Sequence, residues 1–128
     1  MGALPRQTID RVGMVPVEFD EDVNANYVVE YSAAQKVQMT SSDANIPAGV
    51  TEQDWSDLDW GEIVTKGIMR CIVDAGETVT QGTLIMASDN GTVLTATAAA
   101  PLVGRALTTG TAGQYVSVEL MLGSHEPA

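Results

Sequence analysis

The stretch CIVDAGETVTQGTLIMASDNGTVLTATAAAPLVGRALTTGTAGQYVSVELML, residues 71–122, decides the fold class. It consists of short apolar runs separated by glycine-containing turns. Asn90-Gly91 stands between two such runs, 83–86 and 92–96, and this arrangement predicts a β-hairpin with a type I′ turn. Further strand-like runs follow at 103–107 and 115–120. The stretch therefore predicts a β-rich module that binds another molecule rather than transforming it.

The pattern upstream of residue 71 extends the same interpretation. Residues 27–31 and 60–70 are β-type runs, and 46–50 form a turn. Residues 32–42 are compatible with a short helix or a strand. Turn signals recur at intervals of about ten residues, which favours an all-β sandwich or barrel. We therefore expect an all-β fold, either a small β-sandwich or a barrel-like module.

Length and composition limit the class of protein further. The chain has 128 residues, enough for one domain, and a hydrophobic fraction of 45% without a run that approaches a membrane span. The first residues lack the apolar centre of a secretory signal peptide. Cys71 is the only cysteine, which excludes an intrachain disulfide, and we expect it to be a buried thiol.

The charge balance excludes two classes of partner. Six Lys and Arg residues stand against 17 Asp and Glu residues, for a net charge of −11. A domain this acidic repels phosphate, which disfavours nucleic acid and anionic membrane surfaces as partners. The charge supports solubility and is compatible with a partner that carries a basic patch.

The N-terminal residues differ in pattern from the rest, and we divide the chain into an extended arm at 1–26, a β-rich domain at 27–122 and a flexible tail at 123–128. Pro5 and Pro16 prevent a continuous helix in the arm. Its apolar residues alternate, which suits one extended strand, an arm laid across a partner, or a terminus that orders on docking. We expect its removal to leave the fold intact. The predicted partner contacts in the arm are Val12, Met14, Val15, Val17 and Phe19.

Residues capable of catalysis or metal binding are scarce. The single histidine, His125, lies in the polar tail, and no nucleophile-elbow, P-loop or dinucleotide motif is present. An acidic cluster resembles a calcium loop only in part, because a third ligand and the closing glutamate are missing. We expect a solvated loop or a partner contact there, anchored by Trp55 and Trp60, with no enzyme activity, cofactor or metal. The cluster consists of Glu52, Asp54, Asp57, Asp59 and Glu62.

One segment resembles a carrier domain. Residues 73–85 are similar to the "GE-x-V-x-x-G-x-x-I" half of biotinyl and lipoyl domains, in which a carrier lysine sits at a downstream hairpin tip. The matching tip here is Ser88-Asp89-Asn90-Gly91 and has no lysine, since Lys36 and Lys66 both lie upstream. This resemblance implies a related turn geometry, and it argues against a swinging-arm function.

A series of short motifs follows in order along the chain. It consists of Gly49-Val50-Thr51-Glu52, Gly61-Glu62-Ile63-Val64, Asp89-Asn90-Gly91-Thr92-Val93 and Val103-Gly104-Arg105-Ala106-Leu107. This order resembles the "G-V-T-Q", "G-D-x-V", "D-x-x-G-x-V" and "V-G-x-A-L" segments of a different family, the small capsid decoration or cement proteins of tailed bacteriophages. The resemblance covers roughly residues 46–122.

This resemblance implies a protein made in the host cytoplasm that binds the outer surface of the assembled capsid. It implies a trimer that bridges subunits of the major capsid protein and stabilises the shell. Within that picture, residues 12–19 are a candidate for adding a strand to a neighbour's sheet. The alternatives are a structural module of a phage tail or fibre, and a biotinyl- or lipoyl-like domain without its lysine.

Overall fold

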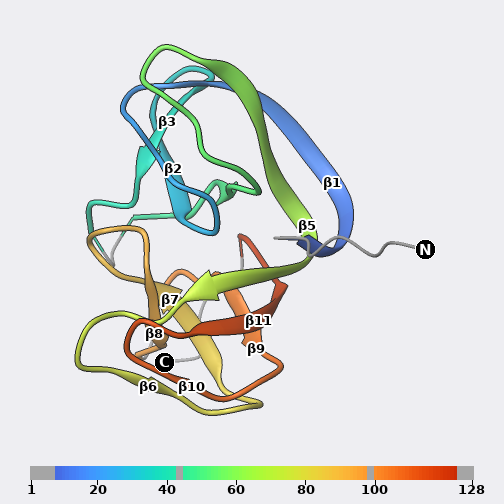
Figure 1. The fold of residues 1–128 in the computed structure, drawn as a ribbon, viewed down its shortest axis with the longest axis vertical. Coiled ribbons are helices and arrows are strands. Elements are labelled where there is room, and N and C mark those ends of the chain that lie inside the picture. Colours follow the sequence, from blue (N-terminus) through green and yellow to red (C-terminus); the bar gives the residue numbers. More distant parts are fainter. Residues whose placement is uncertain (1–7, 43–44, 98–99, 124–128) are drawn as a thin grey trace.

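The structure is a computed structural model that describes residues 8–42, 45–97 and 100–123. The described residues form strands and no helix, which confirms the predicted all-β class (Figure 1). The strands are β1 Thr8–Phe19, β2 Val28–Ala33, β3 Lys36–Met39, β4 Gly49–Val50, β5 Trp60–Ile72, β6 Thr78–Val79, β7 Leu84–Ala87, β8 Val93–Thr95, β9 Gly104–Ala106, β10 Gly110–Thr111 and β11 Tyr115–Leu120.

The first half of the chain closes into a five-stranded barrel. Its strands are ordered β1-β3-β2-β4-β5, and β5 returns to pair with β1, which completes the ring. β1 runs antiparallel to β5 from Thr8 opposite Met69 to Glu18 opposite Trp60. It also pairs in parallel with β3 through Glu18 and Phe19. Of the two predicted architectures, the barrel is the one that forms.

The second half forms a similar arrangement on the other end of β5. The order continues β5-β11-β9-β7-β8, and a parallel bridge between Val73 and Val93 connects the end of β5 with β8. A separate two-stranded sheet of β6 and β10 lies at the outer end of this half (Figure 1). The long strand β5 is therefore shared, pairing with β1 and β4 above and with β11 below.

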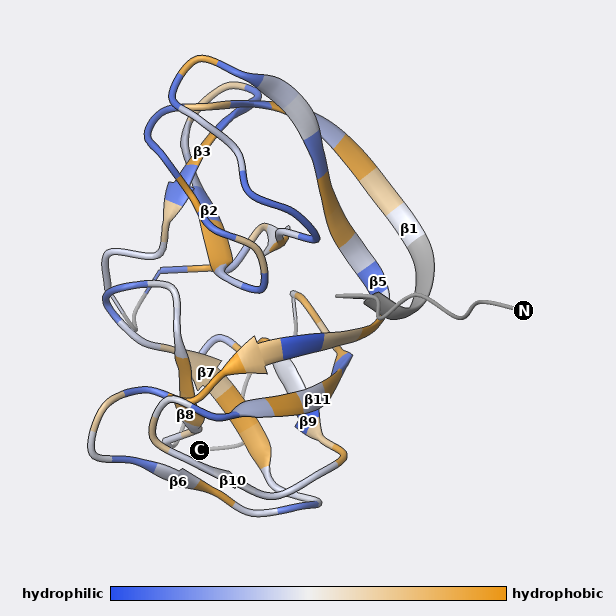
Figure 2. Ribbon diagram, viewed as in Figure 1, coloured by the Kyte–Doolittle hydropathy of each residue, from blue (hydrophilic) through white to orange (hydrophobic). Residues whose placement is uncertain are grey.

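The buried side chains form two clusters. One lies in the first barrel and contains Val17, Phe19, Val23, Val29, Val37 and Ile63. The larger cluster fills the second half and reaches Val28, Val50 and Val64 on β2, β4 and β5. Figure 2 shows hydrophobic residues recurring along the strands of both halves. Since the larger cluster contains residues of both halves, the core ties them together.

β1 has alternating faces, as its sequence predicts. Val17 and Phe19 point into the barrel and are fully buried, whereas Pro16 is exposed. Glu18 donates its backbone N–H to Gln35 on the side of β3, at 2.7 Å. Pro16 lies two residues earlier, so its backbone faces the same side of β1, at a point where β3 no longer pairs with it. Proline has no N–H to donate to another strand at this edge. The register of β1 on β5 also shifts between Thr8 and Met14. Both features oppose the addition of a further strand at this edge.

The hairpin predicted around Asn90-Gly91 is confirmed, but its predicted turn type is wrong. β7 pairs antiparallel with β8, with Ala87 opposite Val93, so five residues make the connection. Gly91 has a φ of 81°, whereas Asn90 is not among the residues with positive φ, and a type I′ turn requires both. The longer loop is held together by side chains instead, because the Ser88 hydroxyl lies 2.6 Å from Asn90 Oδ1 and 2.7 Å from Thr92 Oγ1.

Candidate functional site

Four of the predicted contact residues on β1 pack in or against the hydrophobic clusters of the protein itself. Val17 and Phe19 are fully buried, and Met14 and Val15 are half-buried against the two hydrophobic clusters. Val12 belongs to β1, and its side chain lies outside what the structure describes. The arm therefore contributes its alternating apolar side chains to the chain's own core. The division of the chain at residues 26 and 122 stays a prediction.

Trp55 is an internal anchor of the acidic loop. Its ring stacks on that of Phe19, with centroids 5.3 Å apart and an interplanar angle of 15°. A Cβ at Gly61 would lie 2.5 Å from the Trp55 ring, so only glycine permits this approach to β5. The backbones of Trp55 and Val23 exchange two hydrogen bonds of 2.8 and 2.9 Å. The indole nitrogen is buried as well, so Trp55 presents no donor to a partner.

Trp60 differs from Trp55 because its side chain is 61% exposed at the start of β5. Leu58, which sequence reasoning did not select, is 66% exposed. Both residues belong to the segment 56–60, which we call the tip loop, at the upper end of the first barrel (Figure 1). A leucine within an acidic loop gives no signal in the sequence that it faces solvent. The tip loop is thus an exposed apolar feature at one end of the molecule.

Carboxylates of the acidic region hold the tip loop and its surroundings in place. Asp59 Oδ2 accepts the Ser56 backbone N–H at 2.8 Å, and Asp22 Oδ1 accepts that of Asp57 at 2.8 Å. Asp54 Oδ1 accepts the Ala25 backbone N–H at 2.9 Å. In the described part of the chain, no group of His, Cys, Asp and Glu side chains is arranged to hold a metal ion. These three carboxylates therefore act as structural acceptors for backbone donors.

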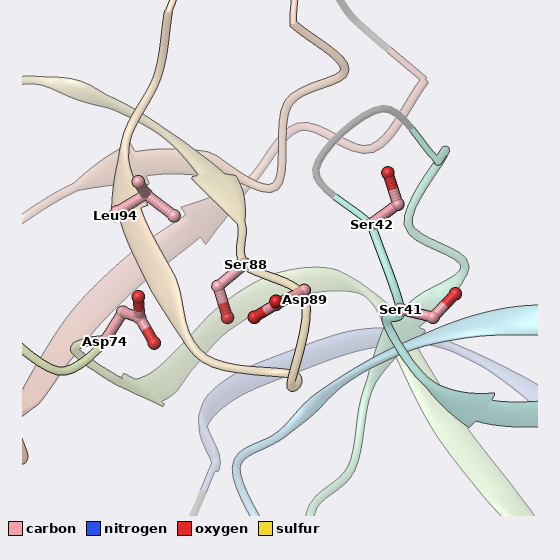
Figure 3. A pocket seen from close by; sticks show the side chains of 6 residues that line it. All are labelled: Ser41, Ser42, Asp74, Ser88, Asp89 and Leu94. Atoms are coloured by element: carbon pink, nitrogen blue, oxygen red, sulfur yellow. The ribbon is translucent and has the colours of Figure 1, made fainter.

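A polar cavity of about 380 Å³ lies between the two halves of the molecule (Figure 3). Thr92 Oγ1 donates to Asp74 Oδ1 at 2.7 Å, and Thr40 Oγ1 donates to the Ser88 carbonyl at 2.8 Å. These contacts join the β7–β8 loop to β3 and to the end of β5. The hydroxyls have no imidazole or amine beside them in the lining, so the cavity does not supply an activated nucleophile. Its lining is Ser41, Ser42, Asp74, Ser88, Asp89 and Leu94.

A second hollow of about 640 Å³ lies beside β2 and contains the half-exposed Tyr31 and Ile46. Glu30 forms part of its lining and is buried. Burial raises the pKa of Glu30, but hydrogen bonds from Gln38, Ser41 and Asn45 outweigh burial and hold the pKa below its usual range. The shortest of these bonds measure 2.8 Å, from Gln38 Nε2 and from Ser41 Oγ. The carboxylate is thus a fixed acceptor that orders the β3–β4 connection.

Two further sequence predictions concern reactive side chains. Cys71 is fully buried in β5, as predicted, and burial raises its pKa to about 12. A thiol with this pKa is not a nucleophile at neutral pH. His125 lies outside the described residues. The described residues also contain no helix long and apolar enough to cross a membrane.

Fold and surface together define a class: an all-β structural module with an exposed apolar tip. The comparisons with known proteins name the family within that class. The family model described as "Phage cement protein" matches residues 8–122. The chain belongs to this family and is a phage capsid decoration protein, a structural component of the virion that stabilises the capsid. The match includes β1, which the resemblance seen in the sequence did not cover.

A solved structure agrees with the fold. The N base of the head fiber gp8.5 in bacteriophage phi29 superposes with a TM-score of 0.70 at 17% sequence identity. The similarity covers 85% of this chain and 93% of the other. No curated protein matches this chain. At this level of identity the structural likeness concerns the fold alone.

Proposed function

We propose that the protein binds the outer surface of the assembled capsid as a trimer and bridges subunits of the major capsid protein. Family membership supports binding to the capsid. The net charge of −11 favours the outer surface, because an acidic protein is repelled by the nucleic acid packed inside a shell. A protein that binds only the assembled state stabilises that state by mass action, and many copies multiply the effect. The function needs no catalytic group.

The observation that carries this proposal is the exposed apolar tip at the end of a closed β-fold. Of the six predicted contact residues whose side chains the structure describes, Trp60 is the one that is mainly exposed. A large aromatic residue exposed at 61% contributes little to the chain's own stability and is typical of the anchors of protein interfaces. We therefore retain Trp60 as a capsid contact. Met14, Val15, Val17, Phe19 and Trp55 instead pack in or against the hydrophobic clusters of the chain.

Co-sedimentation tests the proposal. Purified protein is mixed with mature capsids that lack it, and immature shells serve as the control. We expect saturable binding to mature capsids and a higher rupture temperature of the decorated shells. Cross-linking of the bound protein is expected to give trimers and adducts with the major capsid protein. Absence of binding to either shell would overturn the proposal and favour a tail or fibre component.

A further inference from the structure

Leu58 occupies a backbone conformation that leucine rarely adopts. Its φ is 71°, in the left-handed region where the Cβ of an ordinary residue crowds the backbone. The other described residues with positive φ, glycines aside, are Asn26 and Gln35. Asparagine tolerates this region, and Gln35 sits in the tight turn between β2 and β3. Leu58 is also the most exposed of the large hydrophobic residues, so burial does not account for its presence.

Hydrogen bonds hold Leu58 rigidly in this position. Its backbone N–H donates to the Phe19 carbonyl at 2.8 Å, and the Phe19 N–H donates to the Asp59 carbonyl at 2.9 Å. Phe19 itself is fully buried and stacked on Trp55. The tip loop is therefore tied by backbone hydrogen bonds to a residue whose own side chain is part of the core of the first barrel. A side chain presented this way loses little conformational freedom when it binds.

The charges around the tip loop indicate the chemistry of its partner. Residues 52–62 contain five acidic residues and no basic one. Trp60 stands opposite Glu18 in the pairing of β1 with β5, and Glu62 follows two residues later on the same face of the strand. Lys36 stands opposite Glu18 in the pairing of β1 with β3, so the surroundings of Trp60 contain one lysine among several acidic residues. Apolar side chains in mainly acidic surroundings complement an apolar recess with a rim of Lys and Arg. A second copy of this acidic chain would meet like charge, so it does not fit as the occupant.

We propose that Leu58 and Trp60 together form the docking tip of this protein and insert into an apolar recess with a basic rim on the capsid. This inference rests on the proposed function, since it assigns the surface through which that function is carried out. The rigid loop supplies the two apolar anchors, and the surrounding carboxylates orient the protein on the shell. In this arrangement the exposed side chain of Leu58, at φ 71°, contacts the partner directly.

Leu58→Gly tests this inference with little risk to the fold. Glycine accepts a positive φ without strain, so the variant keeps the loop backbone and loses only the exposed side chain. We expect its thermal midpoint to equal or exceed that of the wild type. In co-sedimentation with mature capsids that lack the protein, we expect the Kd to rise at least about tenfold. Trp60→Ala is expected to weaken binding to a similar degree.

A matched control lies in the other half of the molecule. Tyr115 on β11 is 53% exposed, and Tyr115→Ala is expected to bind like the wild type. Binding of the wild type is expected to weaken as salt rises, since the partner's rim is basic. Unchanged binding by Leu58→Gly, an equal loss in Tyr115→Ala, or binding independent of salt would overturn the inference while leaving the proposed function intact. Failure of the wild type to bind would instead reject the proposed function.

Discussion

Replacing Phe19 by alanine tests whether β1 is part of the folded barrel or a free arm. The side chain is fully buried in the first barrel and stacks on Trp55 with centroids 5.3 Å apart. Removing a buried phenylalanine costs about 3–5 kcal/mol, and the lost aromatic stacking of about 0.5–1.5 kcal/mol places this case toward the upper end. The total stability of a domain is about 5–15 kcal/mol. Phe19→Ala therefore removes a large share of the stability.

Urea unfolding followed by tryptophan fluorescence measures this loss, because Trp55 leaves its contact with residue 19 on unfolding. One kcal/mol lowers the Tm by about 4–8 °C in domains of 60–100 residues and by about 2–4 °C in those of 150–250. For this chain of 128 residues we expect a drop of about 10–20 °C. Tyr115→Ala, the exposed control, should cost less than about 0.5 kcal/mol.

A loss below about 1 kcal/mol in Phe19→Ala would refute the reasoning, because exposed positions behave in this way. It would mean that residues 8–19 do not pack on the barrel in solution. The same reasoning revises the expectation that residues 1–20 are dispensable. Their deletion removes Val17 and Phe19 from the core, together with the strand that pairs with β5 from Trp60 to Met69. We therefore expect the truncated chain to unfold rather than only to lose its capsid attachment.

Three further predictions concern single sites. Gly91→Val should destabilise by about 2–4 kcal/mol, since φ is 81° and a Cβ would lie 2.7 Å from Tyr27 Cδ2; an unchanged Tm would contradict the structure. The pKa of Glu30 in the folded state lies below its ordinary value of 4.5. The stabilising effect of this carboxylate is therefore complete above pH 4.5 and is lost as the pH falls through the folded-state pKa. Urea titrations from pH 7 to pH 3 should thus show a shallower loss of stability in Glu30→Gln than in the wild type or in the exposed control Glu119→Gln, and equal slopes would argue against this role. Cys71, with its pKa raised to about 12, should react with a thiol reagent at pH 8 only after unfolding in urea, and rapid reaction of the native protein would show that the thiol is accessible.

The candidate site could be predicted from the sequence only in part. The two tryptophans stand five residues apart in the same acidic loop, and hydropathy does not tell which one faces solvent. Gly61 determines that Trp55 is the tryptophan that turns inward. Because Gly61 has no Cβ, the Trp55 ring can lie against β5 and stack on Phe19. The exposure of Leu58 could not be predicted either, because hydropathy does not tell which side chains of the loop face solvent. Its exposure follows from a backbone conformation that is set by hydrogen bonds to a strand about 40 residues earlier in the chain.

The sequence by itself determined the local features of this protein. Alternation of apolar and polar residues is a local property, so the strand-like runs at 60–70 and 115–120 and the hairpin around Gly91 could be predicted without a structure. The net charge of −11 likewise follows from composition alone. Only the tertiary structure decided that β1 pairs with β3 and β5 and closes the first barrel. Alternation specifies that one face of a strand is buried, and which surface buries it depends on contacts between segments distant in the chain.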